Sequence, residues 1–328
     1  MSMENVELFD LSFTNLSDEE LFSKADTSSF VSEKITAPRY SYWQSVFRVF
    51  FKKKSNFIFL GLLFFVIFFS IIYPIFNPYN ELENIIASGV THLTTSQAIE
   101  KFGFDVKWLL GTGNIGQSVW NQVWDGARIS IGLSFLCATI NMTIGVVIGA
   151  IWGFSKKVDI VMTEVFNIVG NVPSILLISV LVLVFSPSFW TLVFAMTVTG
   201  WLGIAYFIRT QVMIIRDREY NLASRCVGTP ILRMVFKNIL PFLTSVIVTL
   251  LAAELPSYIS YEVFLSYIGM GIGDNTLGKI IESNQGAMVT TGWEKEFWGP
   301  VVITGIITVV LYVVGQNLGD ASDPKTHR

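Results

Sequence analysis

Polar residues inside one long apolar run are the first candidates for chemistry in this chain. The run Leu240–Ile268 holds Glu254, Ser257, Ser260 and a second carboxylate, Glu262. A carboxylate in hydrocarbon is costly unless it faces water or a polar partner, so such residues often mark the path of an ion or substrate. We predict that Glu254, Ser257 and Ser260 line such a path. For Glu254, a hydrogen bond between neighbouring helices is an equally good interpretation.

Two glycine-rich sequences imitate nucleotide-binding motifs. The sequence from Gly111 to Gly116 matches G-x-G-x-x-G, but that fingerprint requires a βαβ unit and an acidic residue about 20 positions later. Here it precedes an apolar run. The sequence from Gly273 to Lys279 imitates the start of a P-loop, but Ile280 replaces the Ser or Thr that would bind magnesium. We therefore expect this chain to bind no nucleotide or other cofactor.

Histidines and cysteines are too few and too scattered for a catalytic or metal site. The two histidines, His92 and His327, lie near opposite ends of the chain. Cys137 falls in an apolar run and Cys226 in a polar stretch, so a disulfide between them is not expected. We predict no catalytic residues, no metal ligands and no enzymatic activity.

The polar stretch 216–241 lies between two apolar runs and has more internal pattern than a simple connection needs. Gly228 is expected to end a first helix, Thr229 to cap a second one, and Pro230 to be its first residue. The stretch is therefore predicted to form two short helices joined by a sharp turn. Four residues recur with the i, i+3, i+4, i+7 spacing of one face of the first helix: Tyr220, Ala223, Ser224 and Val227.

The composition indicates an all-α polytopic membrane protein. The chain is 52% hydrophobic and 14% charged, whereas soluble domains carry about 25% charged residues. The net charge of −3 gives no indication of nucleic-acid binding. Crossing a membrane takes about 20 apolar residues. Six runs qualify as spans: Phe57–Phe76, Ile129–Phe154, Ile160–Phe185, Phe189–Ile208, Leu240–Ile268 and Phe297–Leu318.

The distribution of basic residues predicts the orientation. If the N-terminus is cytoplasmic, seventeen of the 22 lysines and arginines fall on the cytoplasmic side, as the positive-inside rule requires. The first span is interpreted as a retained anchor and not as a cleaved signal peptide. The chain then divides into a cytoplasmic tail (1–56), a first span (57–76), an extracytoplasmic segment (77–127), a five-helix core (128–318) with the stretch 216–241 on its cytoplasmic side, and a cytoplasmic C-terminal tail (319–328).

A set of ordered motifs resembles a known family. Glu219-Tyr-x-x-Ala-Ser-Arg-x-x-Gly228, followed by Ile239-Leu-Pro241, is similar to the EAA motif of permease subunits in type I ATP-binding-cassette (ABC) importers. The chain further resembles the oligopeptide and dipeptide permeases of the OppC or DppC type, and among them the AmiD-like oligopeptide permeases. Cys226-Val227 and Lys237-Asn238 are mild departures from the family pattern. Four further segments carry the resemblance: 108–120, 126–130, 264–271 and 317–325.

The resemblance implies a six-span permease subunit in the cell membrane, forming half of the translocation pathway of an ATP-driven oligopeptide importer. The implied partners are an OppB-type permease, two cytoplasmic ATPase subunits that bind ATP and Mg, an extracytoplasmic peptide-binding protein, and membrane lipid. No nucleic acid is expected. Arg216 is a further candidate donor to the ATPase. The residues expected to couple to the ATPase are Arg218, Glu219, Tyr220, Ala223, Ser224, Arg225, Gly228 and Pro241.

Other functions remain open at this point. A permease of the same family for dipeptides, nickel or opines would carry the same motifs, because these motifs do not read the cargo. An ion-coupled secondary carrier could also have six spans and intramembrane carboxylates, but it would not need the structured stretch 216–241. A membrane enzyme would need catalytic residues that converge at one depth, and the sequence offers none.

Overall fold

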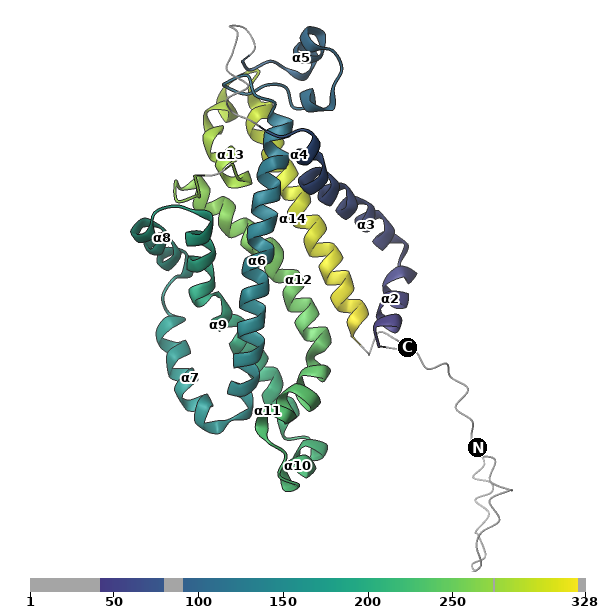
Figure 1. Ribbon diagram of the computed structural model, residues 1–328, viewed down its shortest axis with the longest axis vertical. Coiled ribbons are helices and arrows are strands. Elements are labelled where there is room, and N and C mark those ends of the chain that lie inside the picture. The colour runs from purple at the N-terminus through teal and green to yellow at the C-terminus, as the bar shows by residue number, and fades with distance from the viewer. Residues whose placement is uncertain (1–41, 80–90, 274, 324–328) are drawn as a thin grey trace, which may run out of the picture. The chain divides into compact units, whose positions relative to one another are not determined.

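The computed structural model describes residues 42–79, 91–273 and 275–323, and the regular structure in these ranges is helical (Figure 1). The tail up to residue 41, residues 80–90 of the predicted extracytoplasmic segment, and residues 324–328 lie outside the described residues. Within the described part of the chain, β-type pairing is limited to one isolated bridge between Thr112 and Ser118. The all-α prediction is confirmed for these residues.

Five helical stretches among the described residues are long and apolar enough to cross a membrane. The first combines α3 (Lys54–Ile67), a π-helical turn and α4 (Tyr73–Phe76). A bent pair of shorter helices adds a sixth if it counts as one span. The five stretches are Lys54–Phe76, Val119–Phe154 (α6), Phe189–Arg216 (α9), Ile231–Tyr267 (α11 to α12) and Glu294–Ser322 (α14).

The bent pair replaces what the sequence suggested was one continuous span, Ile160–Phe185. The helices α7 (Lys156–Val169) and α8 (Ser174–Phe185) meet at an angle of 76°. Pro173 precedes α8 with a ψ of 117°, and the residue before a proline is itself pushed away from helical backbone angles. Pro173 therefore marks a complete break between the two helices.

Helix ends extend past the apolar runs that revealed the spans. Helix α6 begins at Val119, ten residues before the predicted Ile129, because the Ser118 hydroxyl caps it by accepting the Asn121 N–H at 3.1 Å. Helix α9 likewise starts behind a capping Ser188 and continues to Arg216. The length of an apolar run is set by the thickness of the hydrocarbon layer, whereas the start of a helix is set by its capping group.

The packing is centred on α6, which crosses α9 along a row of glycines. Gly145, Gly149 and Gly153 recur every fourth residue and bring the two backbones together, as small residues do in membrane helices. A Cβ added at Gly153 would lie 2.6 Å from the carbonyl oxygen of Arg209 and 2.8 Å from the Cβ of Val212. Helix α12 (Thr244–Tyr267) packs on α6 and α14, and α3 packs on α14 together with α2 (Tyr42–Lys52).

Short helices lie at both ends of the long ones (Figure 1). The helices α5 (Thr95–Phe102) and α13 (Leu277–Ser283) lie at one end, and α10 (Glu219–Cys226) and α11 (Ile231–Met234) at the other. Brief 3-10 turns, Val106–Trp108 and Gln285–Val289, accompany the first pair.

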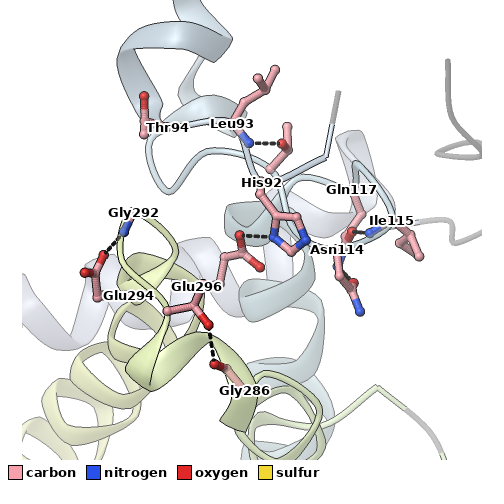
Figure 2. Close-up of polar contacts among 12 residues, drawn as sticks. His92, Leu93, Thr94, Asn114, Ile115, Gln117, Gly286, Gly292, Glu294 and Glu296 are labelled. Atoms are coloured by element: carbon pink, nitrogen blue, oxygen red, sulfur yellow. Dashed lines mark hydrogen bonds and ion pairs between the residues drawn. The ribbon is translucent and has the colours of Figure 1, made fainter. Parts of the chain in front are cut away.

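One clasp joins the segment before α5 to the start of α14. Figure 2 shows the ring of His92 directed at Glu296, with 2.7 Å between Nδ1 and Oε1. The same ring stacks on Trp293 with 3.5 Å between the ring centroids. Thr94 then starts α5 with a capping box, since it shares reciprocal hydrogen bonds with Gln97. This clasp holds the described part of the predicted extracytoplasmic segment against the last long helix.

Candidate coupling hairpin and membrane groove

The stretch 216–241 folds as the hairpin that the sequence predicted, built on helix α10. Gly228 follows the C-cap with a φ of +82°, a conformation in which a side chain would be strained. Its N–H donates to the carbonyl of Arg225 at 2.9 Å, and the N–H of Thr229 donates to the carbonyl of Ser224 at 3.1 Å. These two bonds form a Schellman motif, which closes the end of α10 and reverses the chain.

The second helix of the hairpin begins one residue later than predicted. Pro230 is the N-cap, with a ψ of 147°, and its carbonyl accepts the N–H of Met234 at 3.1 Å, so Ile231 is the first helical residue. Thr229 belongs to the turn that closes α10. Helix α11 continues through a π-helical turn, Val235–Ile239, and a 3-10 turn into α12. The hairpin is thus connected to a long membrane helix through successive helical turns.

Most of the residues predicted to couple to an ATPase lie on the exposed surface of this hairpin. Ser224 differs: it is half-buried, and its hydroxyl lies 3.4 Å from the side-chain nitrogen of Asn238 inside the hairpin. The small-residue face is therefore narrower than predicted. The exposed members of the set are Arg218, Glu219, Tyr220, Ala223, Arg225, Gly228 and Pro241.

Two of the exposed side chains rest on aromatic rings of the protein itself. The guanidinium of Arg225 lies 4.5 Å from the centre of the Phe154 ring at the end of α6. Tyr220 stacks on Phe242, with 5.8 Å between ring centroids. Cation–π and aromatic contacts of this kind limit the rotamers available to both side chains. The surface that α10 offers to a partner is consequently preorganised.

Asn221, which the sequence motif did not single out, fixes α10 to the end of α9. It is fully buried, and its side-chain nitrogen donates to the carbonyl of Ile215 at 2.9 Å. Its side-chain oxygen faces Asn238 at 3.4 Å. The one available signal was position: Asn221 falls between the exposed residues of the helix, on its opposite face.

Arg216, a candidate donor to the ATPase, is directed into the protein instead. Its Nη1 donates to the carbonyl of Gly153 at 2.9 Å and its Nε to Asp217 at 3.2 Å. About two helical turns earlier in α9, Arg209 donates to Asp159 of α7 at 2.5 Å. Asp159 also accepts from the indole N–H of Trp152 at 2.8 Å. These contacts join the end of α9 to α6 and α7.

A groove of about 680 Å³ runs between α8, α12 and α14, and two of the predicted pathway residues line it. Ser257 and Ser260 are both exposed there, beside Tyr261 of the same helix and Tyr312 of α14. Each serine hydroxyl donates to a carbonyl one turn back, at 2.8 Å for Ser257 and 3.0 Å for Ser260. Their oxygen lone pairs remain available as acceptors toward the groove.

Glu254 does not line this groove. It lies beside the hydroxyl of Tyr258, which accepts a hydrogen bond of 2.5 Å from Asn141 of α6. Asn141 also donates to the carbonyl of Met196 in α9 at 3.2 Å. The structure thus brings Ser257 and Ser260 together and places Glu254 in a polar contact among three long helices.

Glu262, the other carboxylate of this run, is fully buried near the opposite end of α12. It accepts hydrogen bonds from Ser130 of α6 at 2.8 Å and from Ser266 at 2.9 Å. The Ser130 hydroxyl in turn accepts the N–H of Leu277 at the start of α13 at 3.1 Å. Buried carboxylates need such partners. This one joins α6, α12 and α13.

Comparison with known proteins agrees with the resemblance seen in the motifs. Residues 145–328 match the family model described as the binding-protein-dependent transport system inner membrane component. Residues 41–88 match the N-terminal TM domain of oligopeptide transport permease C.

Relatives of full length show the same relationship. The chain is 45% identical over 315 residues to the oligopeptide transport system permease protein AmiD of Streptococcus pneumoniae, covering 95% of this chain and 99% of that protein. It is 30% identical to the oligopeptide transport system permease protein OppC of Bacillus subtilis, over 94% of this chain and 98% of the relative. The dipeptide transport system permease protein DppC of Bacillus subtilis is 28% identical over 90% of both chains. The chain therefore belongs to the inner membrane components of binding-protein-dependent transport systems, the membrane permeases of ABC importers.

Proposed function

We propose that this chain is a permease subunit of an ATP-driven oligopeptide importer. It forms half of the translocation pathway and receives force from partner ATPases through the hairpin 216–241. The observation that carries this proposal is the 45% identity to an oligopeptide permease over nearly the whole of both chains. The rigid, exposed hairpin at the end of the long helices supports the coupling role.

The contacts of the hairpin suggest how motion would pass into the membrane. Asn221 fixes α10 to the end of α9, and Arg209 with Asp159 fixes α9 to α7. In the other direction, α11 continues into α12. When ATP closes the ATPase dimer, the displaced hairpin moves α9 and α12 together as rigid elements. The groove lined by Ser257 and Ser260 would then change its access from one side of the membrane to the other.

We further propose six spans with both termini cytoplasmic, counting α7 and α8 as one broken span. Native cysteines offer a test that requires no introduced cysteine, because Cys226 on α10 is exposed and Cys137 in α6 is buried. In cells that make this chain without its partners, an impermeant maleimide should label Cys226 in inside-out vesicles and leave it unlabelled in intact cells. A C226S variant identifies the labelled residue. Labelling of Cys226 from outside would contradict the orientation.

The proposed partners are a homologous OppB-type permease, two cytoplasmic ATPase subunits that bind ATP and Mg, and an extracytoplasmic peptide-binding protein. The cargo proposal has one rival with support, a dipeptide permease, since DppC of Bacillus subtilis is also related at 28% identity. Uptake of labelled peptides of graded length by the assembled importer distinguishes the two. Uptake restricted to two-residue peptides would favour the rival.

Reversing the charge of Glu219 tests the proposed coupling to the ATPase subunits. Glu219 lies in the first turn of α10, where a negative side chain suits the helix dipole. Glu219→Lys should abolish co-purification of the ATPase subunits and peptide-stimulated ATP hydrolysis, while membrane insertion is retained. Glu100→Lys makes the same charge change on exposed α5 at the other end of the molecule and should leave co-purification intact. Full co-purification with Glu219→Lys would refute the coupling role.

A further inference from the structure

Helix α2 has an exposed aromatic stripe that its own packing does not require. Val46 and Phe50 are buried against the end of α14, and the hydroxyl of Tyr42 donates to the carbonyl of Ser322 at 2.8 Å. On a different face, three aromatic side chains recur every fourth residue and remain about half exposed: Trp43 (46%), Phe47 (50%) and Phe51 (46%).

This stripe leads directly into the first long helix. The rings of Trp43, Phe47 and Phe51 follow one another with centroid distances of 6.5 Å, and Phe51 contacts Phe57 of α3 at 5.6 Å. Phe57 belongs to a stretch that is apolar enough to cross a membrane. The aromatic surface of α2 is therefore continuous with the exposed apolar surface of a helix that can cross a membrane, as in helices that lie in the membrane interface.

Basic side chains accompany the stripe and indicate that its occupant carries negative charge. Arg48, Lys52, Lys53 and Lys54 are exposed on α2 and at its junction with α3. Basic residues next to an apolar membrane surface attract anionic lipids. Apolar contact and positive charge together match an anionic phospholipid, whose acyl chains can cover the aromatic stripe while its phosphate meets the basic side chains.

A pocket at the same junction carries a second, independent sign of a ligand. It has a volume of about 340 Å³, and Lys52, Lys53, Asn56 and Asp320 are among its lining residues. Asn56 is 99% buried (1% exposed), and its side-chain nitrogen donates to the carbonyl of Phe50 at 2.7 Å. That bond fixes the orientation of the amide. The Asn56 side-chain oxygen is left with no hydrogen-bond partner in the described structure.

The chemistry of this lining discriminates between headgroups. The two lysines suit a phosphate, whereas the unpartnered side-chain oxygen of Asn56 is an acceptor that needs a donor. Phosphatidic acid carries no alcohol hydroxyl that could donate to this oxygen. A phosphate ester that carries hydroxyl groups can satisfy both kinds of residue at once.

We propose that α2 and the pocket at Lys52, Lys53 and Asn56 form a binding site for an anionic phospholipid with a hydroxylated headgroup, such as phosphatidylglycerol. The phosphate lies at the lysines, a headgroup hydroxyl donates to the side-chain oxygen of Asn56, and the acyl chains lie along the aromatic stripe. If the termini are cytoplasmic, this lipid lies in the cytoplasmic leaflet, and only that placement rests on the proposed orientation. Lipid binding itself can be measured whether or not the chain transports peptides.

The test is lipid retention by the purified full-length chain in detergent, measured by native mass spectrometry with equimolar lipids. Phosphatidylglycerol should exceed phosphatidylcholine by about tenfold, and should also exceed phosphatidic acid. In a Lys52→Gln/Lys53→Gln variant the preference for phosphatidylglycerol over phosphatidylcholine should be lost. The matched control is Lys156→Gln/Lys157→Gln, which removes two exposed lysines at the start of α7, away from the pocket, and should keep the preference.

Three outcomes would overturn the proposal. The first is equal retention of phosphatidylglycerol and phosphatidylcholine by the unmodified chain. The second is an equal loss of the preference for phosphatidylglycerol over phosphatidylcholine in the two lysine variants, which would indicate that general surface charge causes the preference. The third is displacement of the lipid by millimolar glycerol 3-phosphate, which would indicate a site for a soluble phosphate. An Asn56→Leu variant that elutes as a folded chain should bind phosphatidylglycerol and phosphatidic acid equally.

Discussion

At the scale of single residues, the hairpin depends on Gly228, which is exposed, and on Asn221, which is buried. Gly228 is exposed, and no atom lies within 4 Å of the position its Cβ would occupy, so its φ of +82° is the reason for glycine there. Asn221 is buried and makes a hydrogen bond that no apolar residue could replace. The motif signalled the glycine because its role is local. It did not signal the asparagine, whose bond partner belongs to another helix.

Asn221→Ala should loosen α10 from α9. The substitution removes this hydrogen bond, while the Ile215 carbonyl keeps the N–H of Arg218 as a donor at 3.1 Å, so the expected cost is about 0.5–1.5 kcal/mol. Limited trypsin digestion of the purified chain should then cleave several times faster after Arg218 and Arg225. Asn238→Ala removes the longer contact of 3.4 Å and should have a smaller effect. Equal cleavage rates for Asn221→Ala and the unmodified chain would count against this role of Asn221.

At the scale of elements, the crossing of α6 and α9 is set by the glycines at 145, 149 and 153. Backbones approach closely only where no side chain intervenes. On the same helix, Gly132 is exposed and has nothing within 4 Å of its Cβ position. Glycine alone therefore does not identify a crossing point; the periodic row does, together with the partner helix that the fold supplies.

Gly153→Leu should destabilise the chain while Gly132→Leu should not. At position 153 the new side chain would collide with the backbone of Arg209 and with Val212, and overpacking of this kind costs about 1–3 kcal/mol. Thermal unfolding of the two purified variants, followed by size-exclusion chromatography in detergent, measures the difference. A melting temperature for Gly153→Leu equal to that of Gly132→Leu would show that the crossing tolerates a wider separation.

At the scale of the whole molecule, buried polar contacts define where the long helices are joined. Glu262 with Ser130 joins α12 to α6 near α13, and Asp159 with Arg209 joins α7 to α9 near the hairpin. Between these fixed points, α12 contributes Ser257 and Ser260 to an open groove. A permease subunit needs this combination of rigid ends and an accessible middle if a push at the hairpin is to change access to the groove.

Narrowing the groove should block transport without affecting assembly. Ser257→Trp/Ser260→Trp fills part of the volume of about 680 Å³ and should reduce peptide uptake by the assembled importer at least tenfold, with co-purification of the ATPase subunits unchanged. Ser179→Trp, a serine on α8 that does not line this groove, serves as the control. Normal uptake by the double variant would exclude this groove from the pathway.

The sequence by itself determined the class of the protein, the approximate positions of the spans and the form of the hairpin. These features rest on local properties, since apolar runs, basic flanks, Gly228 and Pro230 act within a few residues of their own position. The prediction at Thr229 was wrong by one residue, because Thr229 completes the turn that ends α10 and Pro230 then takes the N-cap position of α11.

Only the tertiary structure decided which residues act together. It separated Glu254 from Ser257 and Ser260, turned Arg216 inward, and revealed Asn221 and the pocket at Asn56. The physical reason is that a buried polar group is satisfied by whatever atom the fold brings within about 3 Å, and that atom often belongs to a helix a hundred residues away, as Ser130 does for Glu262.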